Sequence, residues 1–268
     1  MLIMNRKLIT SRRQFISLPS TRFSWCSPPA VPVVGSGEAQ VWLARLDEEK
    51  ADGLEEILSD AERARAERFR FQRQKKQFVV ARGFLRIILG KYLNMGPDEI
   101  CFEYDRYGKP SICGASGTKI KFNLSHSGGL ALYAVSGGRE IGVDLEQIKP
   151  FLLDERTIAE CLTPRESRRL QALSGRERER FFFDCWTRKE SYLKARGEGL
   201  TVSPNQIESS LFSESPAAGL IKSDCKIRQT PWSFQNLPPI AEYSAALVVE
   251  GCDVRLKFWL FHDALNDE

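Results

Sequence analysis

A six-residue segment, Ile141–Glu146, constrains the fold most strongly, because its apolar side chains recur at every second position. Side chains two apart along a strand point to the same face. We therefore predict a strand with Val143 and Leu145 on the core face and with Asp144 and Glu146 together on the outward face. Adjacent carboxylates repel unless a cation lies between them, and carboxylate oxygens suit Mg²⁺. The alternative is the solvated face of an ordinary strand.

A second segment, residues 181–199, predicts a helix that ends at its glycines. Its bulky apolar residues recur at helical spacing and are expected to face the core: Phe182, Trp186 and Leu193. Glu190 and Lys194 are four apart, so they lie one turn from each other on the same side. They form either an ordinary surface pair or a carboxylate and an amine that hold a metal and a phosphate of one ligand.

The chain has only two histidines, and one of them, His126, lies between two apolar segments at 120–124 and 130–135. We predict two strands there, with His126 on the tight connection between them. Its small serine and glycine neighbours would let a ligand approach the backbone. A hairpin turn that carries a histidine by chance is the alternative.

Together these segments resemble the 4′-phosphopantetheinyl transferase superfamily, in particular its monomeric, surfactin-synthetase-activating subclass. The resemblance extends over about residues 40 to 262 and rests on motifs that occur in the family's order: ERARAERFRF at 62–71, YGKP at 107–110, FNLSHS at 122–127, GVDLE at 142–146 and WTRKESYLKARGEGL at 186–200. It implies an α+β fold made of two pseudo-symmetric α/β halves, with the active site in the cleft between them.

The resemblance also implies roles for particular residues. Asp144, Glu146 and Glu190 would hold Mg²⁺, although Mn²⁺ accepts the same oxygen ligands. Glu190, Lys194 and Asp144 would be the catalytic residues, with Glu190 as the base, directly or through water, and Lys194 on the pyrophosphate. The coenzyme contacts implied are Arg65, Lys109, Ser125, His126 and Lys194, with His126 near the 3′-phosphate. Arg68 and Lys189 could supplement or replace Arg65.

The implied reaction moves the 4′-phosphopantetheine arm of coenzyme A onto a serine of an apo acyl or peptidyl carrier protein and releases adenosine 3′,5′-bisphosphate. Two other classes remain open at this stage. One is a catalytically silent binding module, since a fold alone does not establish function. The other is a metal-dependent phosphohydrolase that uses the same acids. The sequence does not identify the carrier or its pathway.

The charge distribution, the apolar runs and the cysteines limit the classes of partner to be expected. The 268 residues carry a net charge of +4, but basic residues crowd one segment: Arg63, Arg65, Arg68, Arg70, Arg73, Lys75, Lys76, Arg82 and Arg86. No groove-binding motif accompanies them, so an acidic carrier and a phosphorylated coenzyme explain the segment better than nucleic acid does. No apolar run reaches the ~20 residues of a membrane span, so no membrane association is expected. Seven scattered cysteines, without C-x-x-C spacing, indicate reduced thiols in the cytoplasm.

We expect three parts along the chain. Residues 1–37 contain no Asp or Glu and predict an extension that is disordered, a product of an upstream start codon or an organelle-targeting segment. Residues 38–138 form the N-terminal half, and residues 139–268 form the C-terminal half with the metal ligands. Helices are expected at 54–70, 74–93, 155–173 and 178–195, and strands at 40–46, 100–104, 120–124, 130–135, 141–146, 243–249 and 254–261. The duplicated architecture implies a monomer.

Overall fold

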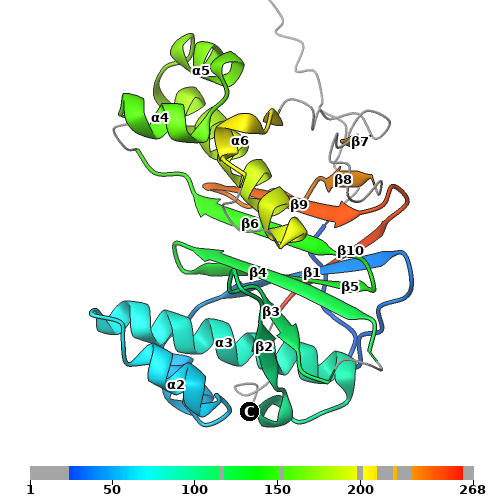
Figure 1. The fold of residues 1–268 in the computed structure, drawn as a ribbon. Helices are drawn as coiled ribbons and strands as arrows, with labels where there is room; N and C mark the ends of the chain where they lie inside the picture. Colours follow the sequence, from blue (N-terminus) through cyan, green and yellow to red (C-terminus); the bar gives the residue numbers. More distant parts are fainter. Residues whose placement is uncertain are drawn as a thin grey trace, which may run out of the picture.

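Two mixed α/β halves meet through the edge strands of two sheets (Figure 1). The computed structural model describes residues 24–114, 118–150, 154–197, 202–209, 220–221 and 231–261. Within this part of the chain, one sheet has the order β10-β1-β5-β4 and the other the order β6-β9-β8-β7. The strands of the first are β1 (Glu38–Arg45), β4 (Ile120–Ser127), β5 (Leu130–Gly137) and β10 (Arg255–Leu260). Those of the second are β6 (Ile141–Gln147), β7 (Leu220–Ile221), β8 (Trp232–Gln235) and β9 (Tyr243–Glu250).

The two halves repeat one topology. In the first, β5 lies antiparallel between β1 and β4, and in the second, β9 lies antiparallel between β6 and β8. Each half inserts a long helix after its first strand: α3 (Gln72–Leu93) and α6 (Gly175–Arg196), both of 22 residues. The α+β fold of two similar halves is therefore confirmed.

Both ends of the described chain are joined to the first sheet. The final strand, β10, pairs in parallel with β1, so the last strand of the chain is added to the N-terminal sheet. Cys26 then bridges to β10: its N–H donates to Phe258 O at 3.0 Å, and its carbonyl accepts from Leu260 N at 2.8 Å. The ring of Trp25 contacts that of Phe258 edge-on at 5.6 Å. Residues 24–36, expected to belong to an independent extension, are thus part of the fold, while residues 1–23 lie outside the described residues.

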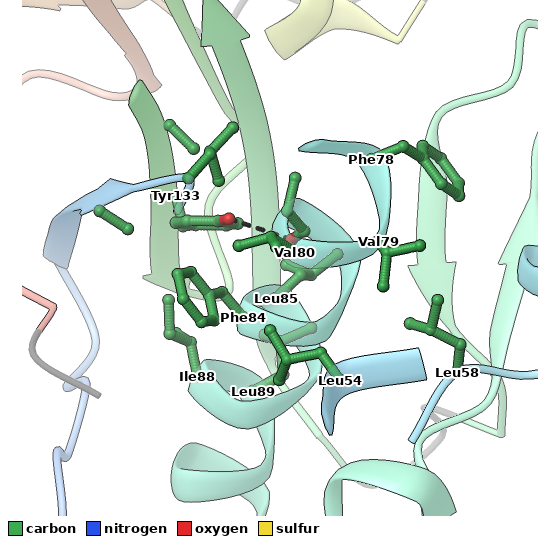
Figure 2. Close-up of a cluster of buried hydrophobic side chains, with 14 of the residues drawn as sticks. Leu54, Leu58, Phe78, Val79, Val80, Phe84, Leu85, Ile88, Leu89 and Tyr133 are labelled. Carbon is green, nitrogen blue, oxygen red and sulfur yellow. Dashed lines mark hydrogen bonds between the residues drawn. The ribbon is translucent and has the colours of Figure 1, made fainter. Parts of the chain in front are cut away.

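Helix α3 contributes more buried residues to the first core than any other described element. Figure 2 shows its apolar side chains packed between α1 (Ala51–Glu55) and the sheet, where Tyr133 donates a hydrogen bond to Ala81 O at 3.0 Å. Phe84, Ile88 and Leu89 are at most 2% exposed. Each contributes about 1.5–3 kcal/mol by leaving water.

A second core joins the sheets to each other. Val143 and Leu145 of β6 are fully buried there, together with Val41, Leu132 and Leu247. The alternation predicted for β6 is confirmed on this face. Helix α6 covers the opposite face. It lies so close to β6 that a side chain at Gly142 would collide with backbone atoms of Ser191 and Ala195.

Two predicted helices are each broken by a second N-cap. The helix expected at 54–70 is α1 followed by α2 (Asp60–Ala66), because Ser59 and Glu62 form a capping box that starts a new helix. The helix expected at 155–173 is α4 (Glu155–Cys161) followed by α5 (Pro164–Gln171), where Thr163 and Glu166 form the same motif. Short 3₁₀ turns complete the helical segments: η1 (Glu48–Lys50), η2 (Pro97–Glu99) and η5 (Pro204–Gln206).

A small hairpin lies beside the first sheet. Its strands are β2 (Phe102–Tyr104) and β3 (Pro110–Ile112), of which the sequence predicted only the first. Its turn is fixed by Asp105, whose Oδ1 accepts from the N–H groups of Tyr107 and Lys109. None of the described helices is both long and apolar enough to cross a bilayer.

Candidate active site

A cavity of about 650 Å³ lies where the two halves meet. Strands β4 and β6 and helix α6 form one side, and α2, α3 and the β2–β3 hairpin form the other. The structure brings every predicted site residue to its wall: Arg65, Lys109, Ser125, His126, Asp144, Glu146, Glu190 and Lys194.

Side chains replace the backbone ladder where the edge strands β4 and β6 meet. Asn123 Oδ1 accepts from Val143 N at 3.0 Å. Ser127 Oγ donates to Glu146 Oε2 at 2.8 Å and accepts from Gln147 N at 3.1 Å. Alternate positions of β4 therefore fix the register of β6, which sets the positions of its two acids.

Asp144 lies at the centre of a three-residue network. Its Oδ1 accepts from Ser125 Oγ at 2.8 Å and from Lys194 Nζ at 2.6 Å, while Lys194 Nζ lies 3.1 Å from Ser125 Oγ. Asp144 is only 3% exposed, because α6 and β4 cover the face of β6 on which the two acids were predicted; the alternative of an ordinary solvated strand face is therefore wrong for Asp144. Its second oxygen, Oδ2, is buried without a hydrogen-bond partner among the described residues.

The neighbouring carboxylates are destabilised in their charged forms. Burial raises the pKa of Glu190 above its ordinary value, the charge of Asp144 raises it further, and Lys194 opposes the shift. Burial likewise raises the pKa of Glu146, with the Ser127 hydrogen bond lowering it and Asp144 raising it. Burial therefore disfavours the charged forms of both acids, and the charge of Asp144 adds to this effect.

These observations fit a site for a cation with oxygen ligands. Buried Asp144 Oδ2 lacks a partner among the described residues, and burial, together with the nearby charge of Asp144, raises the pKa values of Glu146 and Glu190. A cation would relieve both conditions. Within the described ranges, however, no three ligand-type side chains already converge as a ready-made metal cluster. The ammonium of Lys194 is the cation that contacts Asp144 directly.

His126 lies within β4 rather than on the connection where it was predicted. The turn itself is Gly128–Gly129, with φ of 55° and 87°, a backbone conformation that favours glycine. The side chain keeps an exposed edge and lines the cavity. Desolvation of the ring lowers the pKa of His126, and the charge of Lys194 lowers it further. A neutral imidazole at neutral pH is the consequence.

Lys109 connects the hairpin to the other half of the molecule. Its Nζ lies 2.9 Å from Glu140 Oε2 and donates to Ala195 O, near the end of α6, at 3.0 Å. Arg65 is exposed on α2, with its guanidinium carbon 5.4 Å from the centre of the Phe78 ring. Both cations line the same cavity as the carboxylates.

The two proposed substitutes for Arg65 lie elsewhere. Lys189 is completely buried and pairs with Glu166 of α5 while donating to Cys161 O at 2.7 Å. Its side chain fastens α4 and α5 to α6, so it is not available to a ligand. Arg68 is exposed and is not part of the cavity wall.

The wall also includes residues that the sequence did not identify as site residues, among them Arg82, Tyr104 and Trp186. Trp186 was expected in the core but is only partly buried and faces the cavity. Arg82 had a readable signal, because it is a charge four residues after Phe78 on the apolar stripe of α3.

Comparison with known protein families agrees with this geometry. A model described as the 4′-phosphopantetheinyl transferase superfamily matches residues 140–248, and one described as 4′-phosphopantetheinyl transferase, N-terminal, matches residues 47–137. The two matches meet at the connection between β5 and β6.

Similar individual proteins carry related names. The 4′-phosphopantetheinyl transferase HetI of Nostoc sp. is 37% identical over 240 residues, which cover 88% of this chain and 98% of HetI. A phosphopantetheinyl transferase of Thraustochytrium sp. is 29% identical over 74% of this chain and 72% of its own length. The 4′-phosphopantetheinyl transferase Sfp of Bacillus subtilis is 26% identical over 59% of this chain and 68% of its own length.

Proposed function

This chain belongs to the 4′-phosphopantetheinyl transferase superfamily, and we propose that it transfers the phosphopantetheine arm of coenzyme A to a serine of an apo acyl or peptidyl carrier protein. The observation that carries the proposal is the buried network of Asp144, Lys194 and Ser125 beside two further carboxylates, facing a wall with cations. Such a cavity suits a ligand with both a pyrophosphate and a reacting centre.

The chemistry is a phosphoryl-type transfer. The carrier's serine oxygen forms a bond to the β-phosphorus of the coenzyme, and the bridging P–O bond breaks to release adenosine 3′,5′-bisphosphate. The nucleophile belongs to the partner, so no serine of this chain has to react. The protein must orient the two substrates, accept the serine proton and stabilise negative charge on the phosphates.

Asp144, Glu146 and Glu190 would hold Mg²⁺, or Mn²⁺, which accepts the same ligands. When bound, that ion would neutralise charge on the pyrophosphate. Glu190, which lines the cavity beside Asp144 and Lys194, would be the base for the serine hydroxyl, directly or through water.

The cationic side of the site would bind the coenzyme's phosphates. Lys194 lies close enough to Asp144 to serve both the carboxylates and the pyrophosphate. Ser125 and His126, which are consecutive residues of β4, would also contact the phosphates, with His126 at the 3′-phosphate. Lys109 and Arg65 would contact them from the hairpin and from α2. Because a single chain supplies both sides of the cavity, the proposed active unit is a monomer.

The test is incubation with coenzyme A, Mg²⁺ and a panel of apo-carrier proteins, followed by intact mass measurement. A carrier should gain the mass of the phosphopantetheine arm, and the same carrier with its acceptor serine changed to alanine should not. Loss of coenzyme A at equal rates with and without a carrier would identify a phosphohydrolase instead. No modification of any carrier in the panel, together with no binding of coenzyme A, would overturn the proposal.

A further inference from the structure

A single carboxylate holds two buried arginines behind the wall of the cavity. Glu62 Oε1 accepts from Arg82 Nε at 2.8 Å, and its Oε2 accepts from Arg86 Nε at 2.7 Å. Second arms of both guanidiniums lie 2.7 Å from the same oxygens, so each contact is two-pronged. Glu62, Arg82 and Arg86 are 3%, 6% and 1% exposed.

The two arginines continue in different directions. Arg86 Nη1 donates to Pro97 O at 2.9 Å and to Ile100 O at 2.8 Å, which fastens the loop after α3. Arg82 Nη2 donates instead to the hydroxyl of Tyr104 at 2.7 Å. Its guanidinium carbon lies 4.8 Å from the centre of the Phe102 ring. Arg82 therefore joins α2, through Glu62, and α3 to the β2–β3 hairpin.

These joined elements contribute residues to the wall of the cavity. Arg65 comes from α2, Arg82 from α3, and Tyr104, Tyr107 and Lys109 from the hairpin. Arg86 is as deeply buried and shares Glu62, but it does not line the cavity. The hairpin has only two three-residue strands, and so short a pair is marginal without support from neighbouring elements.

We propose that Arg82 is a positioning residue for the coenzyme: through Tyr104 it fixes the hairpin, and with it Tyr107 and Lys109, against the His126 side of the cavity. This rests on the proposed transferase function. An apolar contact would hold the hairpin equally well if stability alone were required, because a buried ion pair stabilises a protein little more than well-packed apolar residues do. The hydrogen bond to Tyr104 adds direction, which sets where the turn of the hairpin lies.

Two variants test the link from either end. Tyr104→Phe removes one hydroxyl and keeps the ring, and Arg82→Lys keeps the charge but loses the fork that reaches Glu62 and Tyr104 together. In both, the KM for coenzyme A should rise about tenfold, as loss of one charge-assisted hydrogen bond implies. The kcat and the KM for the carrier should stay within about twofold, since uniform binding is what is lost. Faster hydrogen exchange at residues 102–112 should accompany the change.

Arg86→Lys is the matched control, because it breaks the same kind of fork on the same carboxylate. It should lower the melting temperature at least as much as Arg82→Lys while leaving the KM for coenzyme A unchanged. An equal rise in that KM for Arg86→Lys would show that Arg82 acts only through general stability. Unchanged KM and unchanged hairpin exchange in Tyr104→Phe would overturn the proposal. If the wild type modified no carrier, the proposed function would fail, and coenzyme A affinity with hairpin exchange would still decide the role of Arg82.

Discussion

Two opposing effects act on the charge of Asp144. Burial at 3% exposure disfavours its charge, yet one of its oxygens receives both Lys194 and Ser125. The other oxygen is left without a partner in the described structure. Such a residue contributes to the fold as well as to the site, although its place in an alternating strand predicts only the second role.

Asp144→Ala is therefore expected to abolish transfer and also to lower the free energy of unfolding. The ammonium of Lys194 and the hydroxyl of Ser125 lose their common acceptor, at a cost of about 1–3 kcal/mol. Urea denaturation measures that loss. Asp144→Asn should recover part of the stability, because its side-chain oxygen still accepts a hydrogen bond, but none of the activity. Near-normal turnover of either variant at saturating Mg²⁺ would remove Asp144 from the site.

Glu190→Gln separates catalysis from binding. It keeps the size of the side chain but removes a charge and the proposed base, so kcat should fall by about two to four powers of ten. Coenzyme A should still bind, which calorimetry would show, because the basic residues of the cavity, Lys194, Lys109 and Arg65, remain. A kcat within a few-fold of the wild type would exclude Glu190 as the base.

His126→Ala is the comparison for Glu190→Gln, because it removes a proposed contact to the 3′-phosphate rather than a reacting group. It should mainly raise the KM for coenzyme A. Dephospho-coenzyme A lacks that phosphate, so its penalty and the penalty of the variant should not add. Fully additive losses would assign His126 to some other contact.

At the scale of elements, the two long helices were predicted from local signals. Helix α6 ends at Gly197 as its glycines predict, and α3 lies within two residues of its predicted start. The signal for the break before α2 was also local, because Ser59 and Glu62 have the spacing of a capping box. It was missed because the helical pattern runs on through residues 54–70. The partner of Lys189 was not local, because Glu166 lies 23 positions away on another helix. Only the fold shows that Lys189 forms a buried ion pair with α5 and is not available to a ligand.

The attachment of α2 to α3 should depend on pH through Glu62. Burial alone would raise its pKa, but Arg82, the Ser59 N–H and Arg86 together lower it below the ordinary 4.5. A lowered pKa in the folded state stabilises the protein above the ordinary pKa, and this contribution is lost as the pH falls through the folded value. Urea unfolding between pH 7 and pH 3 measures it. Glu62→Gln should be less stable at pH 7 and should lose less stability below about pH 4.5. Parallel pH curves for the two proteins would contradict this account.

At the scale of the whole molecule, the two halves and the cleft between them were expected from the family resemblance, and each motif that carries the resemblance contributes residues to one cavity. The attachment of residues 24–36 did not follow. These residues have no periodicity of their own, and the partner that holds them, β10, lies more than 200 residues further along the chain. A contact made only between distant segments leaves no pattern in either of them.

Removal of residues 1–36 should consequently destabilise the protein. It deletes the Trp25–Phe258 contact, the Cys26 bridge to β10 and the Val33 carbonyl that accepts from Gln40 at 2.8 Å. We expect the melting temperature to fall by several degrees relative to a chain that begins at Ser24, as a loss of about 1–2 kcal/mol implies. Differential scanning calorimetry of the two truncated chains gives the comparison. Equal melting temperatures would show that the segment is dispensable to the fold.

The parallel pairing of β10 with β1 also has a consequence for synthesis. The ribosome releases β1 more than 200 residues before the strand that covers its edge, so an emerging first half must wait with an open hydrogen-bonding edge. Trp25 and Cys26 also cannot form their contacts until β10 has been synthesised. The N-terminal sheet thus reaches its final form only after β10 has been synthesised.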